Sequence, residues 1–178
     1  YPILLYYTAA GEPFTQCMAY SLDGGYTFTK YENNPVIPHI IGGNRDPKVI
    51  YCDELGKYVM VLYLDGNTFA IFKSDNLLDW EMIQKLDLPG DAECPDFYPL
   101  TIDGERKWIF SGAADFYYVG VIADGQYVPE QQIKRFHKGD STNYASQTYS
   151  GTGDRIIRIS WNRHGVKNEC FNMHMSFP

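Results

Sequence analysis

A repeat of about 50 residues limits the folds open to this chain more than any other feature of its sequence. The segments that open at Pro47 and Pro95 are alike and start 48 residues apart. Turn glycines keep the same spacing, because Gly56, Gly104 and Gly153 follow one another at intervals of 48 and 49 residues. A unit of this length with about four strands is typical of a β-propeller blade, whereas helical solenoids need helix patterns that this sequence lacks.

Short runs rich in Val, Ile, Tyr and Phe fill these repeats, and Gly, Asp and Asn separate the runs. Apolar runs that alternate with such turn residues indicate β-hairpins, and no segment sustains the 3.6-residue period of an amphipathic helix. The sequence therefore predicts an all-β fold. The expected strands are residues 3–7, 16–21, 48–52, 58–64, 69–74, 107–111, 117–123 and 155–161.

The repeat divides the chain into whole and partial propeller blades. Residues 1–41 end one blade, residues 42–90 and 91–139 form two more, and residues 140–178 begin a last one. About three to four blades leave sheet faces and edges that must be covered. We therefore expect the missing blades of a longer parent chain, or another polypeptide, to pack against them.

Charge and cysteine spacing narrow the possible partners. A formal net charge of −7 disfavours nucleic acid and anionic membrane surfaces, which need a basic patch. No apolar stretch approaches the roughly 18 residues that span a bilayer. Cys17, Cys52, Cys94 and Cys170 are widely spaced and no His stands at ligand spacing, so we expect no metal site and no cofactor.

Polar residues that could carry chemistry stand where the repeats open. These segments are Asn44-Arg45-Asp46-Pro47, Ala92-Glu93-Cys94-Pro95-Asp96 and Asn143-Tyr144-Ala145-Ser146-Gln147. Matching positions on adjacent inner strands would bring Asp46 close to Glu93, giving the pair of carboxylates that glycoside hydrolysis uses. The charge of one carboxylate would help to keep the other protonated, as a general acid requires.

Each of these residues also has a purely structural interpretation. Glu93 fits a solvent-facing turn acid, and Asp46 fits an Asx turn that precedes a strand. Arg45 fits a surface cation paired with its neighbour, and Cys94 fits a small buried hydrophobic residue. The coincidence of these residues at the repeat openings favours the functional interpretation.

The motifs at the repeat openings resemble those of glycoside hydrolase family 32, which includes invertases, inulinases, levanases and exo-fructosidases. Arg45-Asp46-Pro47 resembles the family's Arg-Asp-Pro motif, and Glu93-Cys94-Pro95-Asp96 resembles its Glu-Cys-Pro-Asp motif. The resemblance covers nearly the whole chain and implies a five-bladed β-propeller. Other stretches in the family's order are Tyr20–Phe28, Asn34–Ile37, Tyr118-Val119-Gly120, Tyr144-Ala145-Ser146-Gln147 and Trp161.

The resemblance also implies roles and a substrate class. Glu93 would be the general acid/base, and Asp46 would stabilise the transition state by holding fructosyl hydroxyl groups. The substrate would be a fructose-containing oligo- or polysaccharide, such as sucrose, inulin, levan or a fructooligosaccharide, cleaved with retention of configuration. The substrate-binding residues implied beside these two are Asn44, Arg45, Cys94 and Tyr144.

The chain departs from the family pattern at its nucleophile. The family's nucleophilic Asp lies in an Asn-Asp-Pro-Asn-Gly run on the first blade, and Asn33-Asn34-Pro35 does not supply it. We therefore expect residues 1–178 alone to be inactive and the parent protein to be active. Smaller departures are Ala92, where Trp is common, and residues 139–142, where an Asp-Tyr-Gly-like run is usual. The last residues, 175–178, resemble a linker to the family's C-terminal β-sandwich.

Other functions fit parts of the sequence. The run Ser21-x-Asp23-x-Gly25-x-Thr27-Phe28 matches the aspartate box of sialidases, where it forms a structural hairpin. A related arabinosidase or xylosidase is a further enzymatic alternative. A carbohydrate-binding propeller that kept Asp46 and Glu93 but lost its nucleophile is the non-enzymatic one.

Overall fold

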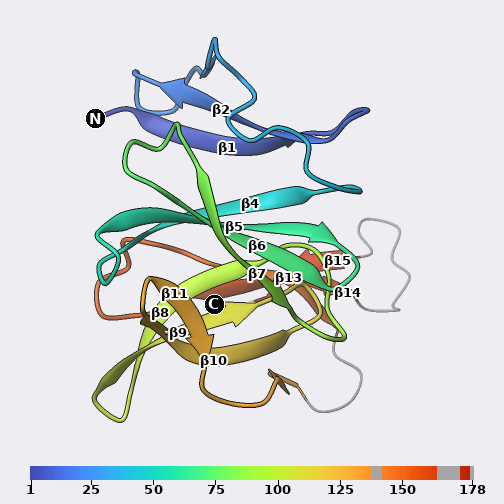
Figure 1. The fold of residues 1–178 in the computed structure, drawn as a ribbon, viewed down its shortest axis with the longest axis vertical. Helices are drawn as coiled ribbons and strands as arrows, with labels where there is room; N and C mark the ends of the chain where they lie inside the picture. The colour runs from blue at the N-terminus through green and yellow to red at the C-terminus, as the bar shows by residue number, and fades with distance from the viewer. Residues whose placement is uncertain (138–141, 164–172, 177–178) are drawn as a thin grey trace. The chain divides into compact units, whose positions relative to one another are not determined.

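Every regular element in the described part of the chain is a β-strand. The computed structural model describes residues 1–137, 142–163 and 173–176, whose strands form four sheets (Figure 1). The chain divides into two compact units, Tyr1–Leu86 and Asp87–Pro178. Within the described ranges, no helix has the length and apolar character needed to cross a membrane. The all-β prediction is confirmed.

The first unit holds two sheets built from strands that follow one another in the chain. One sheet has the order β1 (Ile3–Ala9), β2 (Thr15–Ser21), β3 (Thr29–Lys30). The other has the order β4 (Arg45–Cys52), β5 (Lys57–Asp65), β6 (Thr68–Ser74), β7 (Glu81–Asp87). The two sheets meet at their edge strands β1 and β4, and this contact brings side chains of the first sheet to the start of β4.

The second unit repeats this plan. One sheet has the order β11 (Gln126–Pro129), β10 (Phe116–Ala123), β9 (Glu105–Ser111), β8 (Asp96–Ile102), and β12 (Lys134–Arg135) also pairs with β10. The last sheet has the order β13 (Asn143–Thr148), β14 (Arg158–Arg163), β15 (Met173–Met175). Here the edge strands β8 and β13 are in contact.

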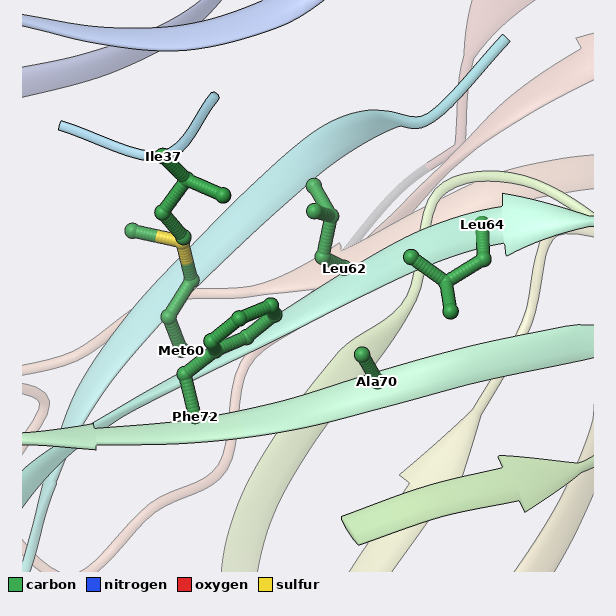
Figure 2. Close-up of a cluster of buried hydrophobic side chains, with 6 residues drawn as sticks. All are labelled: Ile37, Met60, Leu62, Leu64, Ala70 and Phe72. Carbon is green, nitrogen blue, oxygen red and sulfur yellow. The ribbon is translucent and has the colours of Figure 1, made fainter. Parts of the chain in front are cut away.

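The core of the first unit lies on β5 and β6. Met60 and Leu62 face Phe72 and Ala70 across the strand pair, and Leu64 continues the same face of β5 (Figure 2). Alternate residues of a strand point to one side, so this spacing builds a continuous apolar surface. Burial of each large side chain contributes about 1.5–3 kcal/mol.

The core of the second unit is aromatic. The ring of Phe97 on β8 stacks on Trp108 of β9, with ring centroids 4.6 Å apart, and meets Tyr127 of β11 edge-on at 5.4 Å. The hydroxyl of Tyr127 donates a hydrogen bond to the carbonyl oxygen of Trp108 at 3.2 Å, so its one polar atom is satisfied in the interior. These contacts fix β8 in the core of the second unit.

The aspartate-box residues form a closed turn after β2. Asp23 accepts hydrogen bonds from the backbone N–H and the hydroxyl of Thr27 and from the hydroxyl of Ser21. These three bonds hold the pKa of the Asp23 carboxyl well below its ordinary value. The prediction of a structural hairpin at this motif is confirmed.

Seven of the eight expected strands coincide with observed ones, and the expectation at residues 155–161 is wrong at its start. β14 begins only at Arg158, after a turn at Gly153 and Asp154 across which the Thr152 hydroxyl donates to the carbonyl oxygen of Arg155. Pro47 and Pro99 lie inside β4 and β8, which are edge strands and tolerate the missing N–H. The blade boundaries at residues 41, 90 and 139 and the number of blades stay predictions; residues 139–141 lie outside the described ranges.

Candidate functional site

The openings of three strands share an unusual backbone conformation. Asp46, Glu93, Cys94 and Ala145 have φ values of 64°, 61°, 41° and 51°. The ladder between β4 and β5 shifts register around Asp46, and the ladder between β13 and β14 shifts register around Ala145. Residues other than glycine rarely adopt positive φ, and those that do are concentrated at functional sites. β-Bulges also occur next to active sites, where they change the direction of a side chain.

A chain of three hydrogen bonds fixes the bulge at Asp46. The backbone N–H of Asp46 donates to Thr8 Oγ1 at 3.1 Å, and Thr8 donates in turn to Gln16 Oε1 at 2.8 Å. Gln16, which is fully buried, donates through Nε2 to the carbonyl oxygen of Asn44 at 2.9 Å. Side chains of the first sheet therefore hold the start of β4 in place.

Asn44 is completely buried, and its described contacts are structural. Its Oδ1 accepts hydrogen bonds from the backbone N–H groups of Ile40 and Ile41 at 3.1 and 3.3 Å. Its Nδ2 donates to the carbonyl oxygen of Phe14 at 3.4 Å. These bonds hold the loop ahead of β4, and direct substrate binding by Asn44 stays a prediction.

Arg45 and Asp46 form a partly exposed cation–carboxylate pair. Arg45 Nε lies 3.8 Å from Asp46 Oδ2, and the two side chains are 29% and 32% exposed. The guanidinium lies over the ring of Tyr63, 4.6 Å from its centroid, and donates to the carbonyl oxygen of Gly43 at 2.7 Å. A cation fixed on both sides beside an accessible carboxylate is suited to hold several hydroxyl groups at once.

In the second unit, Tyr144 and Glu93 come together from segments 51 residues apart. The hydroxyl of Tyr144 donates a hydrogen bond to Glu93 Oε2. Burial, and secondly this bond to the carboxylate, raises the pKa of Tyr144 to about 12, so the phenol keeps its proton at neutral pH. The guanidinium of Arg163 lies over the Tyr144 ring, 3.3 Å from its centroid, and this cation–π contact holds the ring in place.

Backbone and amide contacts fix the segment around Glu93. The N–H of Ala113 donates to the Glu93 carbonyl oxygen at 3.2 Å. Gln147 Nε2 donates to the carbonyl oxygens of Cys94 and Pro95, both at 3.2 Å. The turn before β8 is thus bound both to the end of β9 and to β13.

Asp96, the last residue of the Glu-Cys-Pro-Asp run, links two strands instead of facing solvent. Its buried carboxylate accepts hydrogen bonds from the N–H of Thr148 at 2.7 Å and from the Thr148 hydroxyl at 3.1 Å. It therefore joins β8 to β13, which carry Glu93 and Tyr144 at their openings. The motif combines one accessible acid with one structural acid.

Three cysteines lie in the described part of the chain, and one of them, Cys94, follows Glu93 directly. Cys94 is half-buried, and Cys17 and Cys52 are buried. Among the residues described here, no three His, Cys, Asp or Glu side chains are grouped as a metal site would require.

The structure therefore assembles the predicted site residues as two groups. Asn44, Arg45 and Asp46 lie together in the first unit, and Glu93, Cys94 and Tyr144 lie together in the second. The predicted approach of Asp46 to Glu93 stays a prediction. Sequence reasoning missed the supporting residues Thr8, Gln16, Asp91 and Arg163, since ordinary spacing gives no signal for a contact between distant strands.

Comparison with known proteins identifies the class of this fold and site. Residues 2–177 match the family model described as glycosyl hydrolases family 32 N-terminal domain. The chain belongs to glycoside hydrolase family 32, and the predicted resemblance is confirmed.

Named relatives agree with this family. The invertase of Debaryomyces hansenii is 30% identical over 175 residues, which cover 89% of this chain and 33% of that protein. The levanbiose-producing levanase of Bacillus subtilis is 38% identical over 104 residues, which cover 56% of this chain and 20% of that protein. The chain thus spans about a third or less of the length of these relatives.

Solved structures place the chain in the all-β propeller class. The fructofuranosidase of Schwanniomyces occidentalis complexed with fructose matches with a TM-score of 0.85 and 30% identity, over 97% of this chain and 38% of that one. The exo-inulinase of Aspergillus awamori matches with a TM-score of 0.83 over 98% of this chain and 44% of that one; at 24% identity it shows the fold alone. The sialidase of Trypanosoma rangeli shares only the fold, at a TM-score of 0.55 and 17% identity.

Proposed function

We propose that the protein containing this chain hydrolyses β-fructofuranosides with retention of configuration and that Glu93 is its general acid/base. The observation that carries the proposal is the contact between the Tyr144 hydroxyl and Glu93 at a strand opening with positive φ. The names of its relatives, invertase and levanase, and a related structure complexed with fructose support a fructose-containing substrate.

In this mechanism Glu93 donates a proton to the glycosidic oxygen as the bond from the anomeric carbon to that oxygen breaks. The Tyr144 hydroxyl then stabilises the Glu93 carboxylate that remains, because a hydrogen bond to a charged acceptor is stronger than a hydrogen bond to a neutral one. A second carboxylate elsewhere in the protein forms the fructosyl–enzyme bond, and water activated by Glu93 later breaks it.

Asp46 and Arg45 hold the fructosyl hydroxyl groups. The partly exposed carboxylate accepts hydrogen bonds that strengthen as positive charge develops on the ring, while Arg45 keeps the carboxylate oriented. Asn44, which is buried, supports the loop ahead of β4, and Cys94 and Tyr144 contact the substrate beside Glu93.

Residues 1–178 alone lack the Asn-Asp-Pro-Asn-Gly run, so we propose that they are inactive without the rest of the protein. The proposed organisation is a partial propeller with blades at residues 1–41, 42–90, 91–139 and 140–178. Further blades and a C-terminal β-sandwich of the same parent chain would complete it.

Fructose release from sucrose, inulin and levan by the full-length protein tests the function. Glu93→Gln should lower kcat by about 10²- to 10⁴-fold, the usual contribution of general acid–base catalysis. Glu105→Gln is the matched control, because Glu105 is an exposed acid of the same unit that pairs with Lys107. Full activity in Glu93→Gln would refute the assignment.

A non-catalytic fructoside-binding propeller is the second candidate, because residues 1–178 contain no Asn-Asp-Pro-Asn-Gly run. It predicts that the full-length protein binds fructooligosaccharides in calorimetry but releases no fructose. Binding together with release that depends on Glu93 would exclude it.

A further inference from the structure

The loop of residues 112–116, between β9 and β10, contacts both segments that carry the Glu93–Tyr144 pair. The N–H of Ala113 donates to the carbonyl oxygen of Glu93 at 3.2 Å. The N–H of Ala145, next to Tyr144, donates to the carbonyl oxygen of Ala113 at 2.9 Å. One residue of this loop therefore ties the backbone at Glu93 to the backbone at Tyr144.

Asp91 binds this loop from the Glu93 side. Asp91 as a whole residue is 2% exposed; its Oδ1 accepts hydrogen bonds from the N–H groups of Ala92 and Ala114, both at 2.8 Å, and its Oδ2 accepts one from the N–H of Phe116 at 3.0 Å. Asp91 stands two residues before Glu93. A single carboxylate thus fixes the residue ahead of Glu93 and two residues of the loop.

The loop is shaped to receive this carboxylate. A Cβ atom at Gly112 would lie 2.5 Å from Asp91 Cγ and 2.6 Å from its Oδ1, so only glycine leaves room for the approach. The close fit makes the distance between Asp91 and the loop hard to change. Small shifts at residue 112 must therefore be passed on to Asp91.

Asp115, a residue of this loop, binds the loop to the strands that follow. It is buried, and its Oδ1 accepts hydrogen bonds from Arg158 of β14 and, at 3.2 Å, from Ser146 of β13. Ser146 in turn lies 2.6 Å from Ser160 of β14, oxygen to oxygen. The loop is therefore anchored to β13 by side chains as well as by the Ala145 backbone.

We propose that Asp91 is a positioning residue, which holds the strained segment at Glu93 on the 112–116 loop so that the Glu93 carboxyl meets the Tyr144 hydroxyl. The inference rests on the proposed catalytic role of Glu93 and adds a residue that the family motifs do not include. The buried carboxylate is energetically expensive, and burial raises the pKa of Asp91 to about 6. Hydrogen bonds from three backbone N–H groups offset the desolvation free energy of this carboxylate. They also bind the loop to the segment that carries Glu93.

Asp91→Asn in the full-length protein tests the proposal. The variant keeps one acceptor oxygen but sets an amide N–H₂ group against the N–H of Phe116, so the segment shifts. We expect kcat for sucrose to fall about tenfold to a hundredfold, as small misplacements of catalytic groups do, while KM changes less than about threefold. Gly112→Ala, which displaces Asp91 sterically, should show the same split between kcat and KM.

Two further variants separate positioning from stability and from the proposed function. Tyr127→Phe removes a buried hydrogen bond outside this loop, and it should lower the melting temperature without changing kcat. Combining Asp91→Asn with Tyr144→Phe should reduce kcat by less than the product of the two single effects, because both act through Glu93.

The outcomes are distinct. If Glu93→Gln abolishes fructose release while Asp91→Asn, folded by circular dichroism, retains the wild-type kcat, the positioning role is overturned and the catalytic assignment stands. A parallel fall of kcat in Asp91→Asn and in Tyr127→Phe would likewise overturn it and assign Asp91 to stability alone. If Glu93→Gln stays active, the proposed function fails, and the positioning role fails with it.

Discussion

Replacement of Tyr144 by Phe removes the hydroxyl that donates to Glu93. The ring keeps its place under Arg163, whose guanidinium lies 3.3 Å from the ring centroid, so the change removes a hydrogen bond and little packing. A hydrogen bond to a charged group contributes about 1.5–3 kcal/mol, and each 1.36 kcal/mol in the barrier is about tenfold in rate. We therefore expect kcat/KM for sucrose to fall by about 10- to 100-fold.

The assay is initial-rate fructose release from sucrose by the full-length protein across pH 4–9, with Tyr149→Phe as control. Tyr149 is exposed and belongs to the same unit, so its hydroxyl should be dispensable. Since the pKa of Tyr144 is raised to about 12, the phenol stays protonated throughout this range and adds no alkaline limb of its own. A loss smaller than about twofold in Tyr144→Phe would refute the reasoning that this bond stabilises the Glu93 carboxylate.

Three further predictions concern supporting residues. Asp96→Ala leaves the Thr148 N–H and hydroxyl without their buried acceptor, so urea unfolding should show a loss of about 2–4 kcal/mol; a change below about 0.5 kcal/mol would contradict the link. Folding favours protonated Asp91, because burial raises its pKa to about 6, so its contribution to stability is greatest below about pH 4 and is lost as pH rises through about 6. Wild type should therefore lose about 2–3 kcal/mol relative to Asp91→Asn between pH 4 and pH 7 in urea titrations, and parallel pH curves would contradict this. Arg45→Lys gives up the fork geometry over Tyr63 and should raise KM for sucrose about threefold to thirtyfold with the melting temperature nearly unchanged; an unaltered KM would remove Arg45 from the site.

Much of the fold could be predicted because each hairpin is encoded locally. Strand runs alternate with Asp-Gly turns, and the repeat of Gly56, Gly104 and Gly153 marks equivalent turns. The start of β14 could not be predicted, since Ile156 and Ile157, which precede Arg158, suit a strand equally well. The structure has a turn at Gly153 and Asp154, across which the Thr152 hydroxyl donates to the Arg155 carbonyl oxygen, and an apolar run alone does not reveal where the strand resumes after it.

The site was partly predictable for a related reason. Repeat openings pointed to Asp46, Glu93 and Tyr144, and the structure gives Asp46 and Glu93 positive φ and joins Tyr144 to Glu93. The support around them depends on contacts between segments distant in sequence, such as Asp91 with the N–H of Phe116. An isolated Asp before Glu93 looks like a turn residue until the loop that it binds is in place.

Release of the leaving group in a single turnover tests the role of Glu93 most directly. The leaving group of sucrose is an alkoxide oxygen of glucose, which needs a proton. The leaving group of β-fructosyl fluoride is fluoride, which departs without one. The account predicts that Glu93→Gln slows the first turnover of sucrose by about 10²- to 10⁴-fold and that of the fluoride by less than about tenfold. An equal loss for both substrates would contradict general-acid catalysis by Glu93.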